Sequence, residues 1–470
     1  MKRSAKSFAT LLFLCSTGAQ AETTLGRLEL RWGDPAVSNS PQVAEHRLLV
    51  TLVTDQGLRV AIDPNSALAG AEDLYSLAGK RVAIEFSASP PKTNGLRMAG
   101  AIVPLNSAID EKISGTTTWV TLMCKFQDNS NEPKSLAFFQ SQYGTAPGQL
   151  DHYWRQVSYN KIDLIGSKAY GWLYLPRPRS AYIRANGSAN LDQLFYDCTN
   201  AANSAVNFAA NGGVQGINMM FNSDLDGYAW GGGKCATLDG IYKCWSTTWN
   251  PPWSFNNLAP LAHEMGHGYG LPHANNSDGD RDPYDNPWDV MSDPWNNAVS
   301  DSTYGRRPKH LSTYSRARLA WVDSARRITL AAGSYRLNIG LDRASLSGSG
   351  NAQMILVTLP GQPSSRYYTI EARKRGGEYE SNLAGDAVII HRVDTQASTP
   401  AFSVDADIPP ANRSNNEGSM FKPGEIWTAP DGAFRVHVQA ATPEGFLVSV
   451  CGPKPTGSDP CFASRITRMK

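Results

Sequence analysis

The sequence has no long apolar run after its N-terminal segment, and it carries little charge. A helix that crosses a bilayer needs about 20 consecutive apolar residues, and no later segment approaches this length, so we predict no membrane span. Only 18% of the 470 residues are charged, the net charge is +2, and basic residues form no long run. A nucleic acid is therefore not an expected partner. With 41% apolar residues, the chain is predicted to be globular.

Residues 1–21 have the features of an export signal. Basic residues open the segment, a short apolar run follows at 8–15, and a small-x-small cleavage site ends at Ala21. Cleavage there would start the mature chain at Glu22. We therefore predict a protein that is secreted, to the periplasm or the extracellular space, without a lipid anchor.

The most informative stretch runs from His263 to His273 and follows the pattern H-E-x-x-H-x-x-G-x-x-H. His263 and His267 are four residues apart, so both project from one face of a helix. Gly270 allows the chain to turn back and bring His273 to the same point. Three neutral imidazoles bind Zn²⁺ and leave a fourth position for water, which is typical of catalytic zinc. Glu264 is then the predicted general base.

This pattern resembles the extended zinc motif of the metzincin peptidases. A short H-E-x-x-H motif arises by chance on ordinary helices, whereas five fixed positions, three of them histidine, are hard to explain without a site. The resemblance implies an α+β fold, with a metzincin-like zinc peptidase domain between an N-terminal and a C-terminal β domain. It covers roughly residues 115–395. The segments at 153–172, 367–373 and 385–394 are similar to the gametolysin and immune-inhibitor-A-like branch.

Metzincins also have a Met-turn, in which a methionine forms an apolar floor beneath the ligands. Met291, 18 residues after His273, is the candidate, and an ordinary core methionine is the alternative. Some metzincins have a tyrosine ligand two residues after this methionine. Asp293 stands at that position here, so no such ligand is expected.

Two groups of glycines near the motif bear on its packing. Gly266 and Gly268 each cost a helix about 1 kcal/mol relative to alanine, so we expect the helix to be closely packed where they lie. The run from Gly231 to Gly233 predicts a loop, which either lies close to an extended substrate or is a plain flexible turn.

Cysteine is scarce, with seven residues in the chain, and Cys15 would leave with the signal. An even number in an oxidising compartment favours disulfides. We favour the short loops Cys235–Cys244 and Cys451–Cys461, which leaves Cys124 with Cys198. The alternative is a free cysteine that blocks the metal in a latent form.

Strand and helix patterns divide the chain into five segments. Residues 22–114, an N-terminal β domain, contain no chemical motif and are a prodomain, a binding module or scaffold. The full division is 1–21 signal peptide, 22–114 N-terminal β domain, 115–325 zinc peptidase domain, 326–451 β-sandwich-like domain and 452–470 tail.

A second metal is a weaker prediction. The acidic segment from Asn275 to Asp285 offers the oxygen ligands that Ca²⁺ prefers, although its spacing is not that of an EF-hand. A solvated acidic turn is the alternative. Asp224 and Asp226 are weaker candidates for the same ion.

Together these observations predict a secreted, monomeric zinc endopeptidase that acts on extracellular proteins or glycoproteins. The motif is also similar to that of secreted bacterial peptidases that cut mucin-type glycoproteins. One alternative is a surface module that binds glycan or protein and contains a structural zinc, although such sites usually have four protein ligands and favour cysteine. Another is a zinc hydrolase of a non-peptide bond. His310, His391 and His437 lie outside any ligand spacing and are expected to be structural or exposed.

Overall fold

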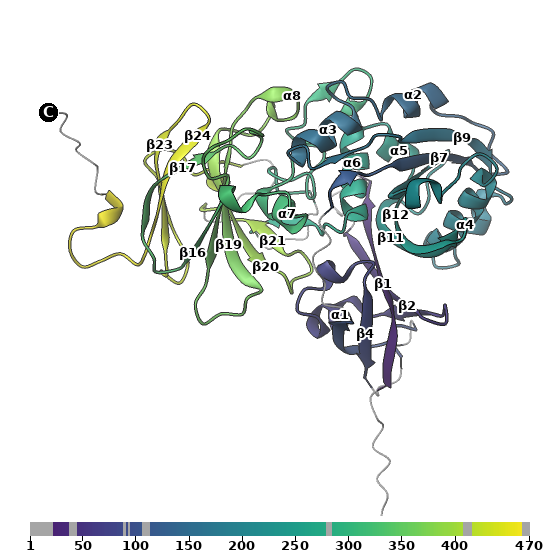
Figure 1. Ribbon diagram of the computed structural model, residues 1–470, viewed down its shortest axis with the longest axis horizontal. Helices are drawn as coiled ribbons and strands as arrows, with labels where there is room; N and C mark the ends of the chain where they lie inside the picture. The colour runs from purple at the N-terminus through teal and green to yellow at the C-terminus, as the bar shows by residue number, and fades with distance from the viewer. Residues whose placement is uncertain are drawn as a thin grey trace, which may run out of the picture.

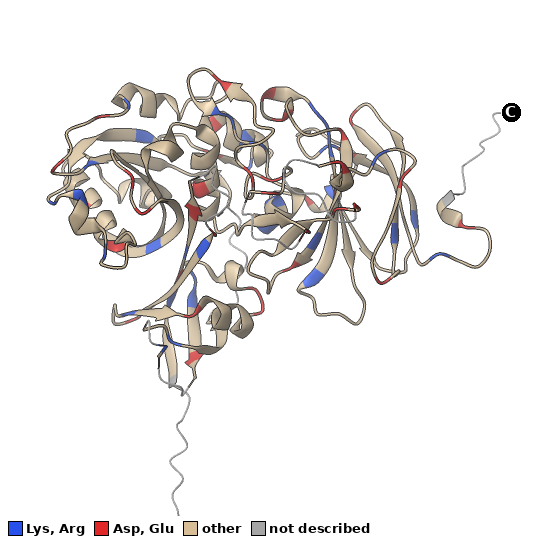
Figure 2. Ribbon diagram, turned by 180° about the vertical axis from the view of Figure 1, so that it is seen from behind, with Lys and Arg blue, Asp and Glu red and all other residues tan. Residues whose placement is uncertain are grey.

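The computed structural model describes residues 22–36, 45–87, 91–92, 95–105, 113–278, 284–407 and 416–462. The predicted signal peptide and the end of the predicted tail therefore lie outside the described residues. The fold is mixed α and β, with several sheets and few helices (Figure 1). Charges of both signs are interspersed along the chain in Figure 2. None of the helices in the described part is long and apolar enough to span a bilayer.

The described residues between 22 and 104 form a small β structure with its own apolar core. Strand β1 alternates as predicted, and Leu28, Leu30 and Trp32 are buried in this core with Val50 and Ile84. The sequence pattern predicts strands at 27–32, 47–53, 58–62 and 81–86, and β1, β2, β3 and β4 lie at these places. The elements are β1 (Glu22–Pro35), β2 (Arg47–Thr54), β3 (Arg59–Ile62), α1 (Pro64–Gly70), β4 (Arg81–Phe86) and β5 (Ala99–Pro104).

Strand β1 also joins this N-terminal structure to the sheet that follows. It pairs antiparallel with β11 (Tyr228–Leu238), and Arg31 lies opposite Gly232. The strand order of the combined sheet is β3-β2-β1-β11-β12-β10-β7-β9. Hydrogen bonding is therefore continuous across the predicted boundary between 22–114 and 115–325. The further strands are β12 (Ile241–Asn250), β10 (Gly216–Phe221), β7 (Trp119–Lys125) and β9 (Lys168–Tyr174).

Helices cover both faces of the sheet around β7. Trp119 and Met123 of this strand pack into one core, and Leu122 and Cys124 pack into another, because successive side chains point to opposite faces. The first core is closed by α2 (Leu136–Ser141), α3 (Leu150–Val157), α5 (Pro252–Phe255) and α6 (Leu258–Gly268), and the second by α4 (Leu191–Ala202). Helix α6 is thus a buried helix beside the sheet.

The loop predicted at Gly231 to Gly233 is wrong, because all three glycines lie inside strand β11. A side chain at Gly231 would overlap the carbonyl oxygen of Glu264, and one at Gly232 would overlap the carbonyl oxygen of Leu30. The glycines therefore allow the strand to pass close to α6 on one side and β1 on the other.

The residues after 326, together with the short strand at 274–276, build two sheets whose apolar side chains share one core, which includes Ile355, Val357, Val436 and Val448. The six-stranded sheet contains β13 (Ala274–Asn276), β21 (Ala401–Ser403), β20 (Ala387–Asp394), β19 (Arg366–Arg373), β18 (Met354–Thr358) and β16 (Arg327–Ala331). The four-stranded sheet contains β17 (Arg336–Asp342), β24 (Gly445–Cys451), β23 (Arg435–Ala441) and β22 (Ile426–Thr428). Strand β13 directly follows His273, so this sheet anchors the end of the motif.

The disulfides are those favoured from the sequence: Cys124–Cys198, Cys235–Cys244 and Cys451–Cys461. Every cysteine in the described residues is thereby paired, so the alternative of a free cysteine that blocks the metal is wrong for this part of the chain. Three disulfides fit an extracellular protein.

Candidate metal centre

The three predicted histidine ligands meet beneath strand β11. Helix α6 carries His263 and His267, and every residue from 258 to 267 is buried. The helix ends at Gly268, and Gly270 has a φ of +89°, so the chain turns back and brings His273 to the helix. The Nε2 atom of His267 lies 3.1 Å from that of His263 and 3.0 Å from that of His273.

Backbone carbonyls orient two of these rings. Nδ1 of His263 lies 2.6 Å from the carbonyl oxygen of Val290, and Nδ1 of His267 lies 2.7 Å from that of Leu271. Because a carbonyl oxygen only accepts, each Nδ1 carries the proton and each Nε2 keeps a lone pair. Lone pairs this close repel each other unless a cation lies between them, so the donor set fits a metal ion.

A fourth group, which the sequence did not reveal, completes the cluster. Oδ1 of Asp34, near the end of β1, lies 2.8 Å from Nε2 of His273 and 3.2 Å from Nε2 of His263. Its Oδ2 lies 3.3 Å from Nε2 of His267. One donor atom from each of the four residues lies within 4.8 Å of the others, so this buried group could hold a metal ion. If this group holds a metal, the carboxylate of Asp34 would compete with water for the fourth position.

Rings from the N-terminal part cover the histidines. Trp32 stacks on His267, with 4.8 Å between ring centroids and 7° between planes. His46 stacks on His273 at 3.4 Å, and its Nδ1 lies 2.6 Å from Oδ1 of Asp34. Although burial raises it, the neighbouring histidines hold the pKa of Asp34 well below its ordinary value.

Glu264 lies beside the cluster and is 1% exposed. Its Oε2 has no hydrogen-bond partner among the described residues. Burial, reinforced by the charge of Asp34, raises the pKa of Glu264 well above its ordinary value. Burying a carboxyl oxygen without a partner is costly, so this residue has the character of a functional group. A small pocket beside it is lined, besides Glu264 itself, by Asp34, Trp253, Pro260, His263, Tyr284, Pro294 and Trp295.

Met291 lies against the ligand helix on the side of Gly266. A side chain at Gly266 would overlap the sulfur of Met291. The carbonyl oxygen of Met291 accepts a hydrogen bond of 3.1 Å from the N–H of Ala274, directly after His273. The carbonyl oxygen of the preceding residue, Val290, accepts the hydrogen bond from Nδ1 of His263. The structure thus places the predicted Met-turn in contact with the helix and with the segment that follows the third histidine.

The other predicted metal candidates are not part of this cluster. Asp226 accepts hydrogen bonds from Ala189 N–H and from Nε1 of Trp230, and Asp224 accepts one from Gly227 N–H. Residues 279–283 of the acidic segment lie outside the described residues, so the calcium site stays a prediction. His310 and His391 are buried and His437 is half-buried, all three apart from the Asp34 group.

The contact between β11 and α6 yields a stability prediction. Gly231→Ala should lower the free energy of unfolding by about 1–3 kcal/mol, because the new methyl group would meet the backbone of Glu264 and Cβ of His267. Gly233→Ala in the same strand is the matched control, since a Cβ there would meet no atom within 4 Å. Urea unfolding of both variants measures the difference. Equal stabilities would show that α6 and β11 are not in close contact.

Comparison of the chain with protein-family models, curated proteins and solved structures found no significant match. The function is therefore argued from the residues and geometry of the site.

Proposed function

We propose that this protein is a secreted zinc-dependent endopeptidase of metzincin type, with His263, His267 and His273 as ligands and Glu264 as the catalytic base. The observation that carries the proposal is a buried carboxyl oxygen, without a partner among the described residues, beside three imidazoles whose donor atoms lie close enough together to hold a metal. Nitrogen and oxygen donors of this kind suit Zn²⁺. Three disulfides and the predicted signal at 1–21 agree with export.

Zinc held by these ligands would supply a Lewis acid that polarises the scissile carbonyl and makes water a stronger nucleophile at neutral pH. Glu264 accepts a proton from the attacking water as the new C–O bond forms. It then gives this proton to the amine nitrogen as the peptide C–N bond breaks. Strand β11 runs past Glu264, and its edge, which pairs with β1 from Gly232 to Tyr228, would hold an extended peptide if β1 were displaced. Extracellular proteins or glycoproteins are the proposed substrates.

A binding module with a structural zinc is the second candidate, and Asp34 is the observation that favours it. Structural zinc sites usually have four protein ligands, and the structure brings four donors together. The unpartnered oxygen of Glu264 counts against this candidate, because a purely structural site gains nothing from it.

Removal of the metal tests the choice between them. We expect the purified protein to contain about one zinc ion per chain. Limited trypsin treatment serves to remove the segment with Asp34, which lies against the three histidines. The treated protein should cleave casein and a peptide library. The chelator 1,10-phenanthroline should abolish cleavage, and added zinc should restore it. Glu264→Ala protein, treated in the same way, controls for residual trypsin. A zinc-loaded chain that cuts no substrate before or after treatment would support the binding module instead.

A further inference from the structure

The segment that orients the first histidine is itself held by side chains from the C-terminal part of the chain. We infer that Arg373 of β19 positions this segment, residues 286–292, and through it the ring of His263. The metal centre then depends on the six-stranded sheet as well as on α6. This inference rests on the proposed function and names a positioning residue for the same site.

Residues 286–292 contact the metal centre at two points. The carbonyl oxygen of Val290 lies 2.6 Å from Nδ1 of His263, and Met291 lies against Gly266 of the ligand helix. The segment belongs to no helix or strand, so no regular ladder of hydrogen bonds fixes its backbone. Its conformation, and with it the direction of the Val290 carbonyl, therefore depends on contacts with side chains.

Arg373 donates directly to the backbone of this segment. Its side chain is fully buried, and Nη1 donates a hydrogen bond of 2.5 Å to the carbonyl oxygen of Trp288, two residues before Val290. The same nitrogen lies 3.1 Å from Oε1 of Glu371, and Nη2 pairs with Glu380. A guanidinium has a rigid, planar set of donors, so the two carboxylates that hold it also fix where it meets Trp288.

The side chain of Trp288 is fixed by the same part of the chain. Its ring is fully buried in a small core with Leu383, Ala387 and Ile389. Its Nε1 donates a hydrogen bond of 2.9 Å to Oγ of Ser419. All these partners follow residue 326, so the C-terminal part holds both the backbone and the side chain of Trp288.

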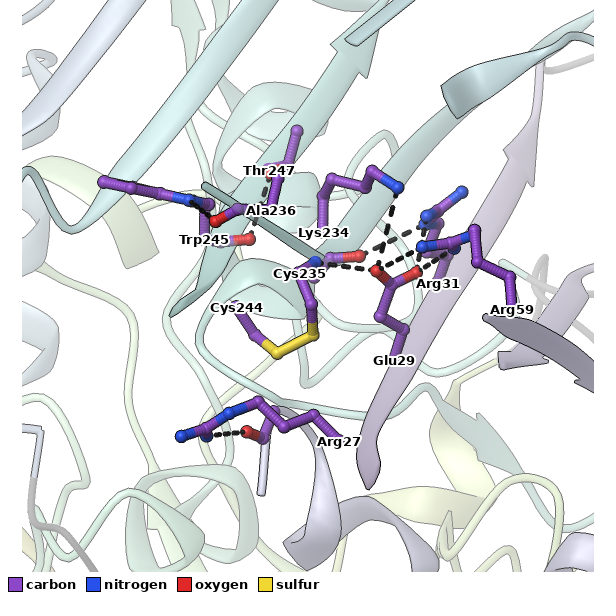
Figure 3. Close-up of a disulfide and its surroundings, with 12 residues drawn as sticks. Arg27, Glu29, Arg31, Arg59, Lys234, Cys235, Ala236, Cys244, Trp245 and Thr247 are labelled. Carbon is purple, nitrogen blue, oxygen red and sulfur yellow. Dashed lines mark hydrogen bonds and ion pairs between the residues drawn. A yellow bond between two sulfur atoms is a disulfide. The ribbon is translucent and has the colours of Figure 1, made fainter. Parts of the chain in front are cut away.

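A buried charge also holds the backbone of a neighbouring element elsewhere in this chain, and Figure 3 shows that example. Oε1 of Glu29 accepts a hydrogen bond of 2.7 Å from the N–H of Cys235, while Arg31 pairs with the same carboxylate. Buried ion pairs contribute little net stability, and fixing one arrangement is their best-attested use. The buried ion pairs of Arg373 therefore fit a role in holding Trp288 in place.

Arg373→Lys tests this role, because lysine keeps the positive charge and loses the planar set of donors. We expect the zinc affinity, measured by competition with a fluorescent chelator, to fall about 10- to 100-fold, the usual effect of changing a group that orients a metal ligand. The visible spectrum of the Co²⁺-substituted protein should also change, because the ring of His263 takes a different orientation.

Arg435→Lys in β23 is the matched control. Arg435 is 4% exposed, its Nε donates a hydrogen bond of 3.1 Å to the carbonyl oxygen of Gly452, and it pairs with Asp459. It thus holds a backbone carbonyl as Arg373 does, but in the four-stranded sheet. Neither the zinc affinity nor the Co²⁺ spectrum should change in this variant.

Hydrogen exchange on the metal-free chain gives a readout that needs neither zinc nor activity. The N–H of Met291 donates a hydrogen bond of 2.9 Å to Oδ1 of Asp289, inside the segment that Arg373 holds. This amide should exchange faster in Arg373→Lys than in the native chain or in Arg435→Lys, because the local structure opens more often.

Ser419→Ala is a milder variant for the case that Arg373→Lys does not fold. It removes the hydrogen-bond partner of Trp288 Nε1 and leaves the ion pairs of Arg373 in place. Exchange in residues 286–292 should become faster and zinc binding weaker, in the same direction as for Arg373→Lys. Native values of both quantities in Ser419→Ala would count against the inference.

The outcomes separate this inference from the peptidase proposal. Unchanged zinc affinity in folded Arg373→Lys protein, even with a lower free energy of unfolding, would make Arg373 a structural residue and overturn the inference, while the peptidase proposal would stand. Weakened zinc binding in Arg373→Lys, together with a native zinc-loaded chain that cleaves nothing, would keep the positioning role and overturn the peptidase. A native chain without affinity for zinc would overturn both.

Discussion

Glu264→Ala is expected to lower the rate of peptide hydrolysis by about two to four orders of magnitude, the usual size of a general-base contribution. The zinc content should stay the same, because Glu264 is not one of the four grouped donors. The comparison is made in the Asp34→Asn chain, so that the carboxylate of Asp34 beside the three histidines does not mask the loss. Initial rates on a fluorogenic peptide and zinc analysis give the two readouts.

Stability separates this catalytic role from a structural one. Oε2 of Glu264 is buried without a hydrogen-bond partner in the described structure, so removing the carboxyl group should leave the free energy of unfolding unchanged or raise it. Glu264→Gln keeps the volume and is the matched variant. A chain that keeps its full rate without this carboxylate would exclude Glu264 as the base. One that loses zinc and unfolds more easily would make it a structural residue.

The histidine cluster could be predicted because its signal is local. The spacing of four residues places two rings on one helical face, and Gly270 at a φ of +89° makes the reversal that brings in the third. The close packing expected at the helix glycines is also found. A side chain at Gly266 would overlap Met291, and one at Gly268 would lie 2.8 Å from the ring of Trp119.

Asp34 could not be predicted, because its position depends on pairing between distant segments. The alternation of residues 27–32 predicts a strand, but nothing in it specifies β11 as the partner. The error at Gly231 has a similar cause, because this glycine allows β11 to lie close to α6, and the sequence does not show that the two elements are neighbours. Helix ends are also hard to predict. The residue pattern at 191–208 predicts one helix, but α4 ends at Ala202, and the pattern at 309–321 predicts another, but α7 spans only Thr313–Arg318.

His267→Ala is expected to have the largest effect on the metal itself. Nε2 of His267 lies within 3.1 Å of Nε2 of both other histidines, so it is the central donor of the group. Losing a direct ligand should weaken zinc binding by more than the roughly 10- to 100-fold that changes around the ligands cost. Peptide hydrolysis should fall to background for the same reason.

Thermal unfolding shows whether that loss acts through the metal. A ligand that binds only the folded state stabilises it, so chelation should lower the Tm of the native chain and leave that of His267→Ala unchanged. His437→Ala, in β23, is the control and should respond to the chelator as the native chain does, since His437 is not part of the metal group. Normal zinc content in folded His267→Ala protein would mean that the ligand set is wrong. In that case Glu264 would not lie beside a metal-activated water, and the proposal of a zinc peptidase would be wrong.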